Sequence, residues 1–590
     1  MMKILLTTLN AKFVQSSLAL RCLAAACRQQ GFGNVETAEY TINHNAYDIL
    51  RRIHAFHADV IGFSCYIWNI DMTLHLISLL RQICPDVTIM VGGPEVTYTA
   101  RELLTAEGNI DYALQGEGEA ILPELIASWL NGEDGTAVGG VLRRTADGAI
   151  EGNELIREVP DLDLLPFPYD DADLASLSHQ LVYYESSRGC PFHCQYCLSG
   201  RDDTVRFRSA ALVIEELKRL VAAGVKQVKL VDRTFNCNPR HYRPILAFMV
   251  SLQATVNFHL EIEPGLVTEE DLALLSQAPR GRIQLELGIQ STYGPTLQAI
   301  RRHNDWPHIV HVMNVIRSLG TIHLHLDLIV GLPYETMQAL RRSFNDIYSL
   351  QPHKLQIGFL KLLKGSGIRR DYSQDYACDL RGPYEVLATK WLSYEAVGTM
   401  KVFEDVFERI YNSGKFSYTL AYVDRFFAGD WFSFYERLTD HWLCRGFDRL
   451  AVSDATVCHF LWDSLTALTE LTAEEKDVAR QLLCLDMLTC FRFRLKPSFL
   501  GWEEAPRQLT DPFFRREEGP AAYFTGYRFT NWRDIKMRYH LWPITPAVGK
   551  ELRRYADGPD EAAYILAESG ADGVCWRLLN KAALAAEGVI

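Results

Sequence analysis

Three cysteines lie within eight residues in the segment Ser186-Ser187-Arg188-Gly189-Cys190-Pro191-Phe192-His193-Cys194-Gln195-Tyr196-Cys197. Thiolates are soft ligands that suit zinc or iron–sulfur clusters. A structural zinc site normally closes with four ligands, and no second cysteine pair lies nearby. His193 sits inside the short loop, where its use as a fourth ligand would strain the chain. We therefore expect Cys190, Cys194 and Cys197 to bind a [4Fe–4S] cluster with one iron left open.

A repeated strand-then-helix pattern surrounds and follows this segment. Short apolar runs predict strands at 181–185, 227–231, 257–262, 282–287, 323–330 and 354–360. Parallel strands connected by helices form either an open sheet or a barrel, and six are too few for a closed eight-fold barrel. The pattern predicts a partial (β/α)6 barrel over residues 181–375.

The chain before the cysteines alternates in the same way, and its strands end in small-residue turns. Examples are Val91-Gly92-Gly93-Pro94-Glu95 and Gln115-Gly116-Glu117-Gly118-Glu119. A doubly wound sheet binds ligands at the carboxyl edge of its strands, so these turns are candidate binding loops. We expect an α/β chain with a Rossmann-like domain at 1–135, a linker at 136–180, the barrel at 181–375 and a mainly α-helical domain at 376–590. In the last region, helical periodicity marks 461–468, 476–488 and 561–569.

Composition narrows the class of protein. The 590 residues are 48% hydrophobic and 23% charged, with a net charge of −13. No apolar run approaches the length that a membrane helix needs, so we expect a soluble, cytoplasmic protein without a membrane span. An acidic chain argues against extended contact with nucleic acid, because that contact needs a basic surface. Most of the other cysteines are isolated in apolar segments and are expected to be buried small hydrophobes.

The cysteine spacing, with the aromatic Tyr196 before the third cysteine, resembles the radical S-adenosylmethionine (SAM) superfamily. The resemblance covers about 181–375 and extends to the ends of the six strands. It implies that Asp232 or Thr234 binds the SAM amino group and that Glu261, with Gln290 or Ser291, meets its ribose and carboxylate. It also implies that the backbone at Ile329 and Gly331 packs against adenine. The Gly-Gly-Glu sequence of many members is absent, and strand-end carboxylates such as Asp232 and Glu261 could instead cap the next helix.

The first domain resembles the cobalamin-binding domain that precedes many radical SAM domains. The residues that carry this resemblance, and that it implies contact cobalamin, are Ser64, Tyr66, Trp68, Asn69, Gly92, Gly93, Pro94, Glu95, Gly116 and Glu117. Glycine allows close backbone approach, and Tyr66 and Trp68 could lie under the corrin or simply pack a domain interface. The Asp-x-His-x-x-Gly signature is absent, which predicts cobalt without a protein imidazole below it.

Together the resemblances imply a cobalamin-dependent radical SAM enzyme, similar to the class B radical SAM methyltransferases, from a branch with an uncharacterised helical C-terminal extension. Such an enzyme uses a [4Fe–4S] cluster, S-adenosyl-L-methionine and cobalamin to methylate an unactivated carbon or phosphorus centre, through methylcobalamin and a 5′-deoxyadenosyl radical. Rearrangement, cyclisation or ring contraction, and a cobalamin or redox sensor without turnover, are the alternatives. The expected partners are a small-molecule, lipid or peptide substrate and an electron donor such as flavodoxin or ferredoxin. Tyr184 and Arg233 are the candidate catalytic side chains.

Overall fold

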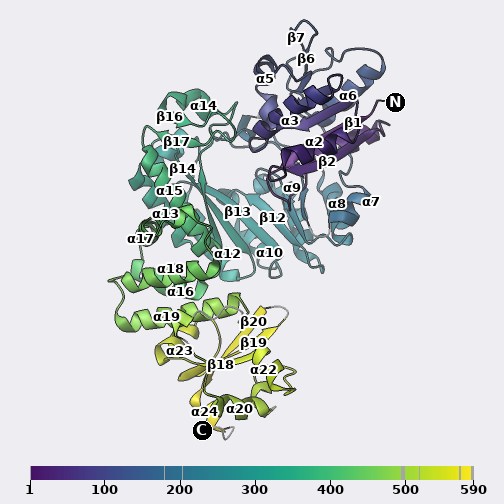
Figure 1. The fold of residues 1–590 in the computed structure, drawn as a ribbon. Coiled ribbons are helices and arrows are strands. Elements are labelled where there is room, and N and C mark those ends of the chain that lie inside the picture. Colours follow the sequence, from purple (N-terminus) through teal and green to yellow (C-terminus); the bar gives the residue numbers. More distant parts are fainter. Residues whose placement is uncertain are drawn as a thin grey trace. The chain divides into compact units, whose positions relative to one another are not determined.

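The computed structural model describes residues 2–177, 180–201, 204–492, 498–501, 503–516, 518–570 and 573–586. It contains two compact units, Met1–Val397 and Gly398–Ile590 (Figure 1). The expected linker (136–180) and the expected barrel (181–375) each include two residues that lie outside the described residues. Among the described residues, no helix is long and apolar enough to cross a membrane.

The first unit begins with a seven-stranded sheet in the order β2-β1-β3-β4-β5-β6-β7. Its strands are β1 (Ile4–Asn10), β2 (Val35–Thr41), β3 (Val60–Ser64), β4 (Thr88–Gly92), β5 (Tyr112–Leu114), β6 (Val141–Arg144) and β7 (Ile150–Gly152). Its helices are α1 (Leu18–Gln29), α2 (Ala46–His54), α3 (Ile70–Ile83), α4 (Pro94–Thr97), α5 (Ala100–Ala106) and α6 (Gly118–Leu130). β1 to β5 are parallel. Two apolar clusters account for the nearly continuous burial of β1, β3, β4 and β5, as expected of a doubly wound sheet, while the edge strand β2 is partly exposed. β6 and β7 are antiparallel and lie within the segment expected to link the domains.

A six-stranded sheet follows in the order β15-β14-β13-β12-β11-β8, with all neighbours parallel. Its strands are β8 (Leu181–Tyr184), β11 (Gln227–Leu230), β12 (Asn257–Ile262), β13 (Ile283–Gln290), β14 (His323–Val330) and β15 (Lys354–Phe359). This sequential parallel order confirms the predicted partial barrel. β13 extends past its predicted end because Leu287 and Ile289 continue the buried face of the strand.

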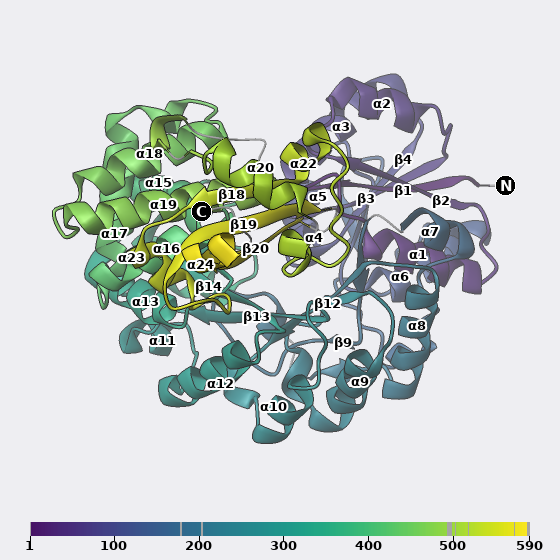
Figure 2. The same ribbon diagram turned by 90° about the horizontal axis from the view of Figure 1, so that it is seen from below.

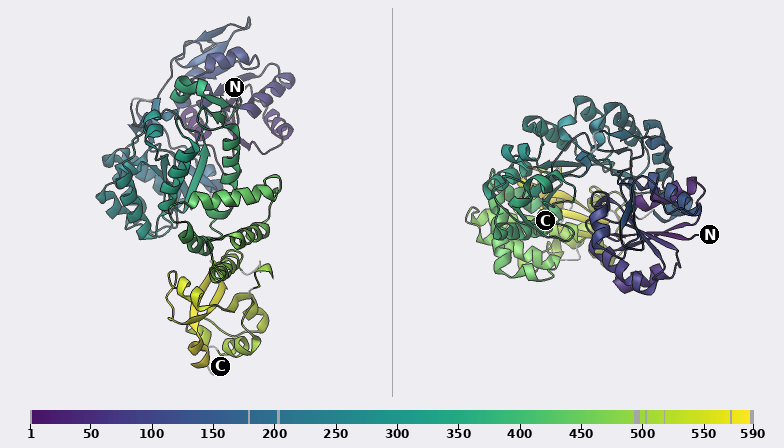
Figure 3. Two further views of the ribbon diagram at one scale, coloured as in Figure 1. Left: turned by 90° about the vertical axis from the view of Figure 1, so that its left-hand side faces the viewer. Right: turned by 90° about the horizontal axis from the view of Figure 1, so that it is seen from above.

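Helices cover the outside of this sheet. They are α8 (Ala210–Ala222), α9 (Pro239–Ser251), α10 (Glu269–Leu275), α11 (Gly294–Ala299), α12 (Trp306–Leu319) and α13 (Met337–Ser349). Both end-on views show them as an arc around the strands (Figures 2 and 3). The remaining elements of this unit are α7 (Asp171–Ser176), β9 (Ser187–Arg188), β10 (Arg206–Phe207), α14 (Gly367–Tyr372), β16 (Tyr376–Cys378) and β17 (Val386–Thr389).

The second unit is mainly helical and also contains a three-stranded antiparallel sheet. Helix α15 (Tyr394–Phe407) precedes α16 (Ser417–Val423), α17 (Trp431–Cys444), α18 (Asp454–Ala467), α19 (Ala473–Cys490), α20 (Arg507–Arg515), α21 (Glu518–Ala521), α22 (Trp532–Arg538), α23 (Pro546–Leu552) and α24 (Lys581–Ala586). The sheet consists of β18 (Tyr539–Pro543), β19 (Ala562–Gly570) and β20 (Gly573–Asn580). Helices α18 and α19 confirm two of the predicted helices.

The helix predicted at 561–569 is wrong, because this segment forms the central strand β19. The strand pairs with β18 on one side and β20 on the other. Tyr564 and Leu566 face one side and Ile565 and Ala567 the other, and all four are buried. A short run that is apolar on both faces fits a central strand as well as a helix, so its periodicity could not separate the two.

Candidate active site

The cysteine loop lies between β9 and β10, next to the carboxyl end of β11. The Cys190 sulfur lies 3.4 Å from the hydroxyl of Thr234, which follows β11. Gly189 has φ +93°, and a Cβ there would clash with the Thr204 carbonyl, so this turn of the loop requires glycine. Cysteine thiolates are the ligands that hold iron–sulfur clusters, and three of them on one loop fit such a cluster.

Arg302 connects this loop to the sheet, and the sequence did not single it out. Its Nη1 donates to the Cys194 sulfur at 3.8 Å, and its Nη2 donates to Glu263 Oε2 at 2.5 Å. Burial raises the pKa of the Cys194 thiol, and the guanidinium opposes that rise. A buried cation beside a cysteine stabilises its thiolate, which is the form that binds iron. The donor set and its charge therefore fit an iron–sulfur cluster.

Asp232 and Thr234 lie at the end of β11, as expected, but their contacts differ. The Asp232 carboxylate is fully buried and accepts hydrogen bonds from the backbone and hydroxyl of Ser186 and from the hydroxyl of Ser187. Burial raises its pKa, although these hydrogen bonds oppose the effect. Asp232 thus fixes the position of the segment that leads into the cysteine loop, while the hydroxyl of Thr234 contacts Cys190.

Of the other residues expected to contact SAM, Glu261 and Ser291 already bind other side chains, whereas Gln290 has an unpaired oxygen among the described residues. Glu261 forms an ion pair with Lys229 at 3.1 Å, and buried Ser291 hydrogen-bonds to Glu335 and Ser343. Gln290 is buried at φ +68°, and its Oε1 has no hydrogen-bond partner among the described residues. A buried amide oxygen without a partner fits a ligand contact.

Ile329 and Gly331 lie at the end of β14, as expected. Ile329 is the penultimate residue of the strand, and Gly331 follows it at φ +92°. The Gly331 amide donates to Glu335, a fully buried carboxyl whose pKa burial raises to about 8. No sequence pattern singles out Glu335, because it lies beyond the strand end and only the fold buries it.

A cavity of about 450 Å³ lies between the carboxyl edge of the first sheet and the strand ends of the barrel. Its lining includes the predicted residues Ser64, Tyr66, Trp68, Gly92, Gly93, Pro94, Gly116, Glu117 and Arg233. A Cβ at Gly93, which has φ +103°, would lie 2.7 Å from the Cys65 carbonyl oxygen. The glycine therefore lets the loop after β4 pack closely against the loop after β3, and both loops line the cavity.

The aromatic pair and two polar residues of this region have defined contacts. Tyr66 and Trp68 stack with ring centroids 4.4 Å apart, and the indole of Trp68 donates to the Leu9 carbonyl. Asn69 and Glu95 do not line the cavity: Asn69 is buried and donates to Thr8, Leu9 and Ser64, which fixes the loop after β3. Glu95 is buried and accepts a hydrogen bond from Tyr384 at 2.6 Å.

Glu117 lines the cavity within a charged cluster. It forms ion pairs with Arg188 at 3.0 Å and with Arg206 at 2.7 Å. Burial acts to raise the pKa of Glu117, but Arg206 and Arg188 outweigh it and lower the pKa. Arg188 also pairs with Glu119 and Glu185, so this cluster joins the first sheet to the cysteine segment.

The two tyrosines of β8 point in opposite directions, which corrects the placement of Tyr184. Tyr183 lines the cavity, whereas Tyr184 is 1% exposed, and its hydroxyl donates to Glu216 at 2.5 Å. Successive side chains of a strand alternate between its faces, so only one of the pair can reach the cavity. Arg233 is exposed and lines the cavity, as the sequence led us to expect.

The barrel strands also place polar side chains on the face opposite the helices. Lys229 pairs with Glu286 at 2.9 Å, and His259 Nε2 lies 2.7 Å from the same carboxylate. Burial acts to raise the pKa of Glu286, but His259 and Lys229 outweigh it and lower the pKa to about 2. Burial lowers the pKa of His325 to about 4. The alternating polar positions of these strands were the signal that could have revealed this group.

Three families match the chain: the B12 binding domain at residues 4–126, the radical SAM superfamily at 184–347, and a protein family of unknown function (DUF4080) at 372–561. The cobalamin-dependent radical SAM methyltransferase TokK of Streptomyces tokunonensis is 27% identical over 50% of this chain and 46% of its own length. The chain spans about half the length of such curated relatives.

Two further proteins show how widely the likeness extends. The anaerobic magnesium-protoporphyrin IX monomethyl ester cyclase of Synechocystis sp. is 36% identical over 38% of this chain and 46% of its own. The solved structure of the cobalamin-dependent S-adenosylmethionine radical enzyme OxsB with aqua-cobalamin has a TM-score of 0.55 at 12% identity and covers 84% of this chain and 81% of that one. This last likeness concerns the fold. The cavity is thus lined by residues of both matched regions, and the chain joins a B12-binding-domain region to a radical SAM region and is similar to the cobalamin-dependent radical SAM methyltransferases.

Proposed function

We propose that this chain is a cobalamin-dependent radical SAM enzyme that methylates an unactivated carbon or phosphorus centre. The observation that carries the proposal is the shared cavity. Ser64, Gly92 and Gly116 line it from the first sheet, while Tyr183 and Arg233 line it from the barrel. A corrinoid held by the first group of residues would face the strand ends that surround the cysteine loop.

In this proposal the cofactors when bound supply a 5′-deoxyadenosyl radical and a transferable methyl group. The protein binds and orients them and excludes water, which protects a radical from side reactions. Cys190, Cys194 and Cys197 hold the cluster, and Arg302 stabilises the thiolate of Cys194. Gln290 offers its unpaired amide oxygen to SAM.

The exposed guanidinium of Arg233 suits a carboxylate or phosphate group of the substrate. The substrate we propose is a small molecule, lipid or peptide, and the reductant is a flavodoxin or ferredoxin in the cytoplasm. We also propose that the cobalamin-binding domain ends at 135, the linker at 180 and the radical SAM barrel at 375.

A second candidate is cyclisation or rearrangement without methyl transfer. The likeness to the magnesium-protoporphyrin ester cyclase, 36% identical over 229 residues, favours it. The two candidates share the same cofactors and differ in the fate of the SAM methyl group.

Anaerobic incubation of the reconstituted chain with CD3-labelled SAM, a reductant and cell extract separates them. Methyl transfer predicts that mass spectrometry finds the label in a product, together with 5′-deoxyadenosine. 5′-Deoxyadenosine without label in any product would support the cyclase candidate. Neither product in the presence of a reduced cluster would contradict both and support a sensor.

A further inference from the structure

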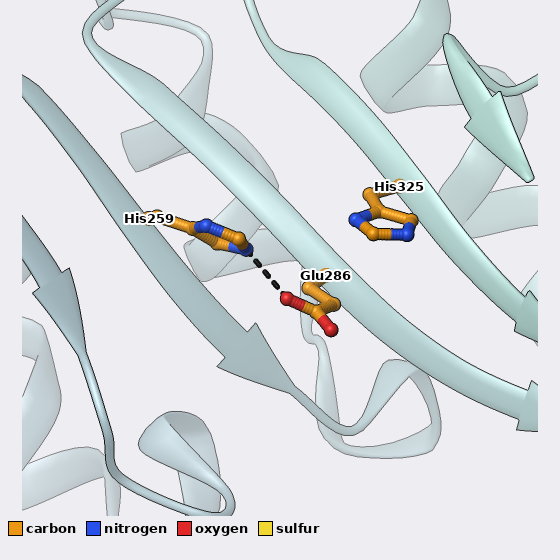
Figure 4. Close-up of side chains that lie close together, drawn as sticks. All are labelled: His259, Glu286 and His325. Atoms are coloured by element: carbon orange, nitrogen blue, oxygen red, sulfur yellow. Dashed lines mark ion pairs between the residues drawn. The ribbon is translucent and has the colours of Figure 1, made fainter. Parts of the chain in front are cut away.

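Three potential metal ligands converge from three neighbouring strands of the barrel. His259 lies on β12, Glu286 on β13 and His325 on β14, and one ligand atom of each lies within 4.8 Å of the others. Glu286 is in register with His325 on one side and with Glu261 on the other, and His259 precedes Glu261 by two residues. All three side chains therefore project from the same face of the sheet. Figure 4 shows the Glu286 carboxylate between the two imidazole rings.

Hydrogen bonds do not account for this arrangement. His259 Nε2 lies 2.7 Å from a Glu286 oxygen, and His325 Nε2 lies 3.3 Å from Asp327 Oδ1. Both nitrogens and the Asp327 oxygen are buried, and none makes a hydrogen bond of acceptable geometry with a described residue. Buried polar atoms normally have a partner, so these two nitrogens and this oxygen suit contact with an ion.

Three carboxyl groups lie around the two imidazoles. Glu261, Glu286 and Asp327 contribute three carboxyl groups, and Lys229 is the cation that forms ion pairs with the first two. Buried charges are normally paired or bound to metals. A divalent cation would be favoured beside these carboxyl groups.

Lys229 does not exclude an ion from this site. Its Nζ lies 2.9 Å from Glu286 and 3.1 Å from Glu261. Since Glu261 alone can keep the lysine paired, Glu286 can bind an ion without leaving a buried ammonium unpaired.

We propose that His259, Glu286 and His325 bind one divalent first-row transition-metal ion on the inner face of the barrel. Two imidazoles and one carboxylate suit ions such as Mn²⁺, Fe²⁺ and Zn²⁺ and leave coordination positions open for water or an oxygen atom of a substrate. Asp327 lies beside His325 and can orient it. The site is separate from the cysteine loop, and it stands whether or not the chain transfers methyl groups.

Mn²⁺ is the suitable probe, because thiolates bind it poorly and the cysteine loop will not compete. The full chain is dialysed against EDTA and titrated with Mn²⁺, while the EPR signal of free Mn²⁺ is followed. We expect one ion to bind per chain. His259→Gln and His325→Gln should each weaken binding by about tenfold or more.

His311→Gln is the matched control, because His311 also lies beside a glutamate, Glu269, but at an exposed position on α12. It should leave the affinity unchanged, as should Cys190→Ala. Circular dichroism checks that each variant folds, and Glu286→Gln, which keeps the side-chain shape, provides a further test if a histidine variant does not. Absence of saturable binding to the wild type, equal binding by the folded ligand variants, or loss of binding in Cys190→Ala would overturn the proposal.

Discussion

Arg302 Nη2 lies 2.5 Å from the Glu263 carboxylate, while Nη1 of the same guanidinium reaches the Cys194 sulfur at 3.8 Å. The guanidinium therefore joins the end of β12 to the cysteine loop. Both partners of the ion pair are largely buried, with side chains 11% exposed. Burial raises the pKa of Glu263, and Arg302 opposes the rise.

Arg302→Gln should therefore have two effects. Glu263 would remain as a buried carboxyl without its cation, at a cost of about 3–5 kcal/mol in the free energy of unfolding. The loss of a positive charge beside Cys194 should also shift the cluster midpoint to more negative potentials. Redox titration of the reconstituted chain measures the shift. Arg243→Gln, which removes a different arginine–carboxylate pair, should leave the potential unchanged, and an equal shift in both would contradict a local effect.

Replacing any of Cys190, Cys194 or Cys197 by alanine should abolish iron binding after anaerobic reconstitution. Cys237→Ala is a demanding control, since that thiol is close enough to interact electrostatically with Cys190. It should retain wild-type iron and sulfide. Iron assays and the cluster absorption spectrum decide the outcome, and a triplet variant with full iron content would disprove the assignment.

A bulky side chain in the cavity should block corrinoid binding. A Cβ at Gly92 would meet the Leu114 Cβ at 3.6 Å, so Gly92→Phe places a ring in the cavity without backbone strain. We expect hydroxocobalamin, followed by its absorbance, to bind at least about tenfold more weakly, because the two would occupy the same space. Gly108→Phe adds the same ring in the same domain at an open surface position and should bind normally. Equal binding by both variants would place the corrinoid elsewhere.

The tyrosines of β8 should separate stability from ligand binding. Tyr184→Phe removes a buried hydroxyl from Glu216 and should lower the free energy of unfolding by about 1–3 kcal/mol, with little effect on corrinoid binding. Tyr183→Phe removes a cavity hydroxyl and should change binding more than stability. Thermal unfolding together with hydroxocobalamin titration tests both. The reverse pattern would restore Tyr184 as the cavity residue.

Glu335 should make stability depend on pH. Burial raises its pKa from 4.5 to about 8, although hydrogen bonds from Gly331, Leu332 and Ser291 oppose the rise. The unfolded chain loses this proton at lower pH than the folded chain, so the stabilising contribution falls as pH rises from about 5 to about 8. In Glu335→Gln the fall in melting temperature over that range should be smaller. Glu215→Gln, at an exposed position, should behave as wild type, and identical profiles for all three proteins would refute the buried-carboxyl account.

The order of the strands and loops in the first two domains could be predicted from the sequence, because each of these elements depends on a local pattern of residues. Apolar runs such as 257–262 and 323–330 predicted strands with the observed bounds. The cysteine spacing predicted a cluster loop, and it lies at the carboxyl end of the barrel strands. Small-residue turns such as Gly92-Gly93-Pro94 predicted loops at the edge of a sheet, and these line the cavity.

Contacts between distant segments required the tertiary structure. Arg302 acts on Cys194, and Tyr384 on Glu95, across long stretches of chain that no local pattern connects. Which face of β8 points toward the cavity decided that Tyr183, and not Tyr184, lines it. His259, Glu286 and His325 are unremarkable on their own strands, and only the parallel register brings them within 4.8 Å. The sequence determined most of the elements and the chemistry of their residues, since both are local. The fold decided that 562–570 is a strand and which side chains meet, since these depend on sheet pairing, register and burial.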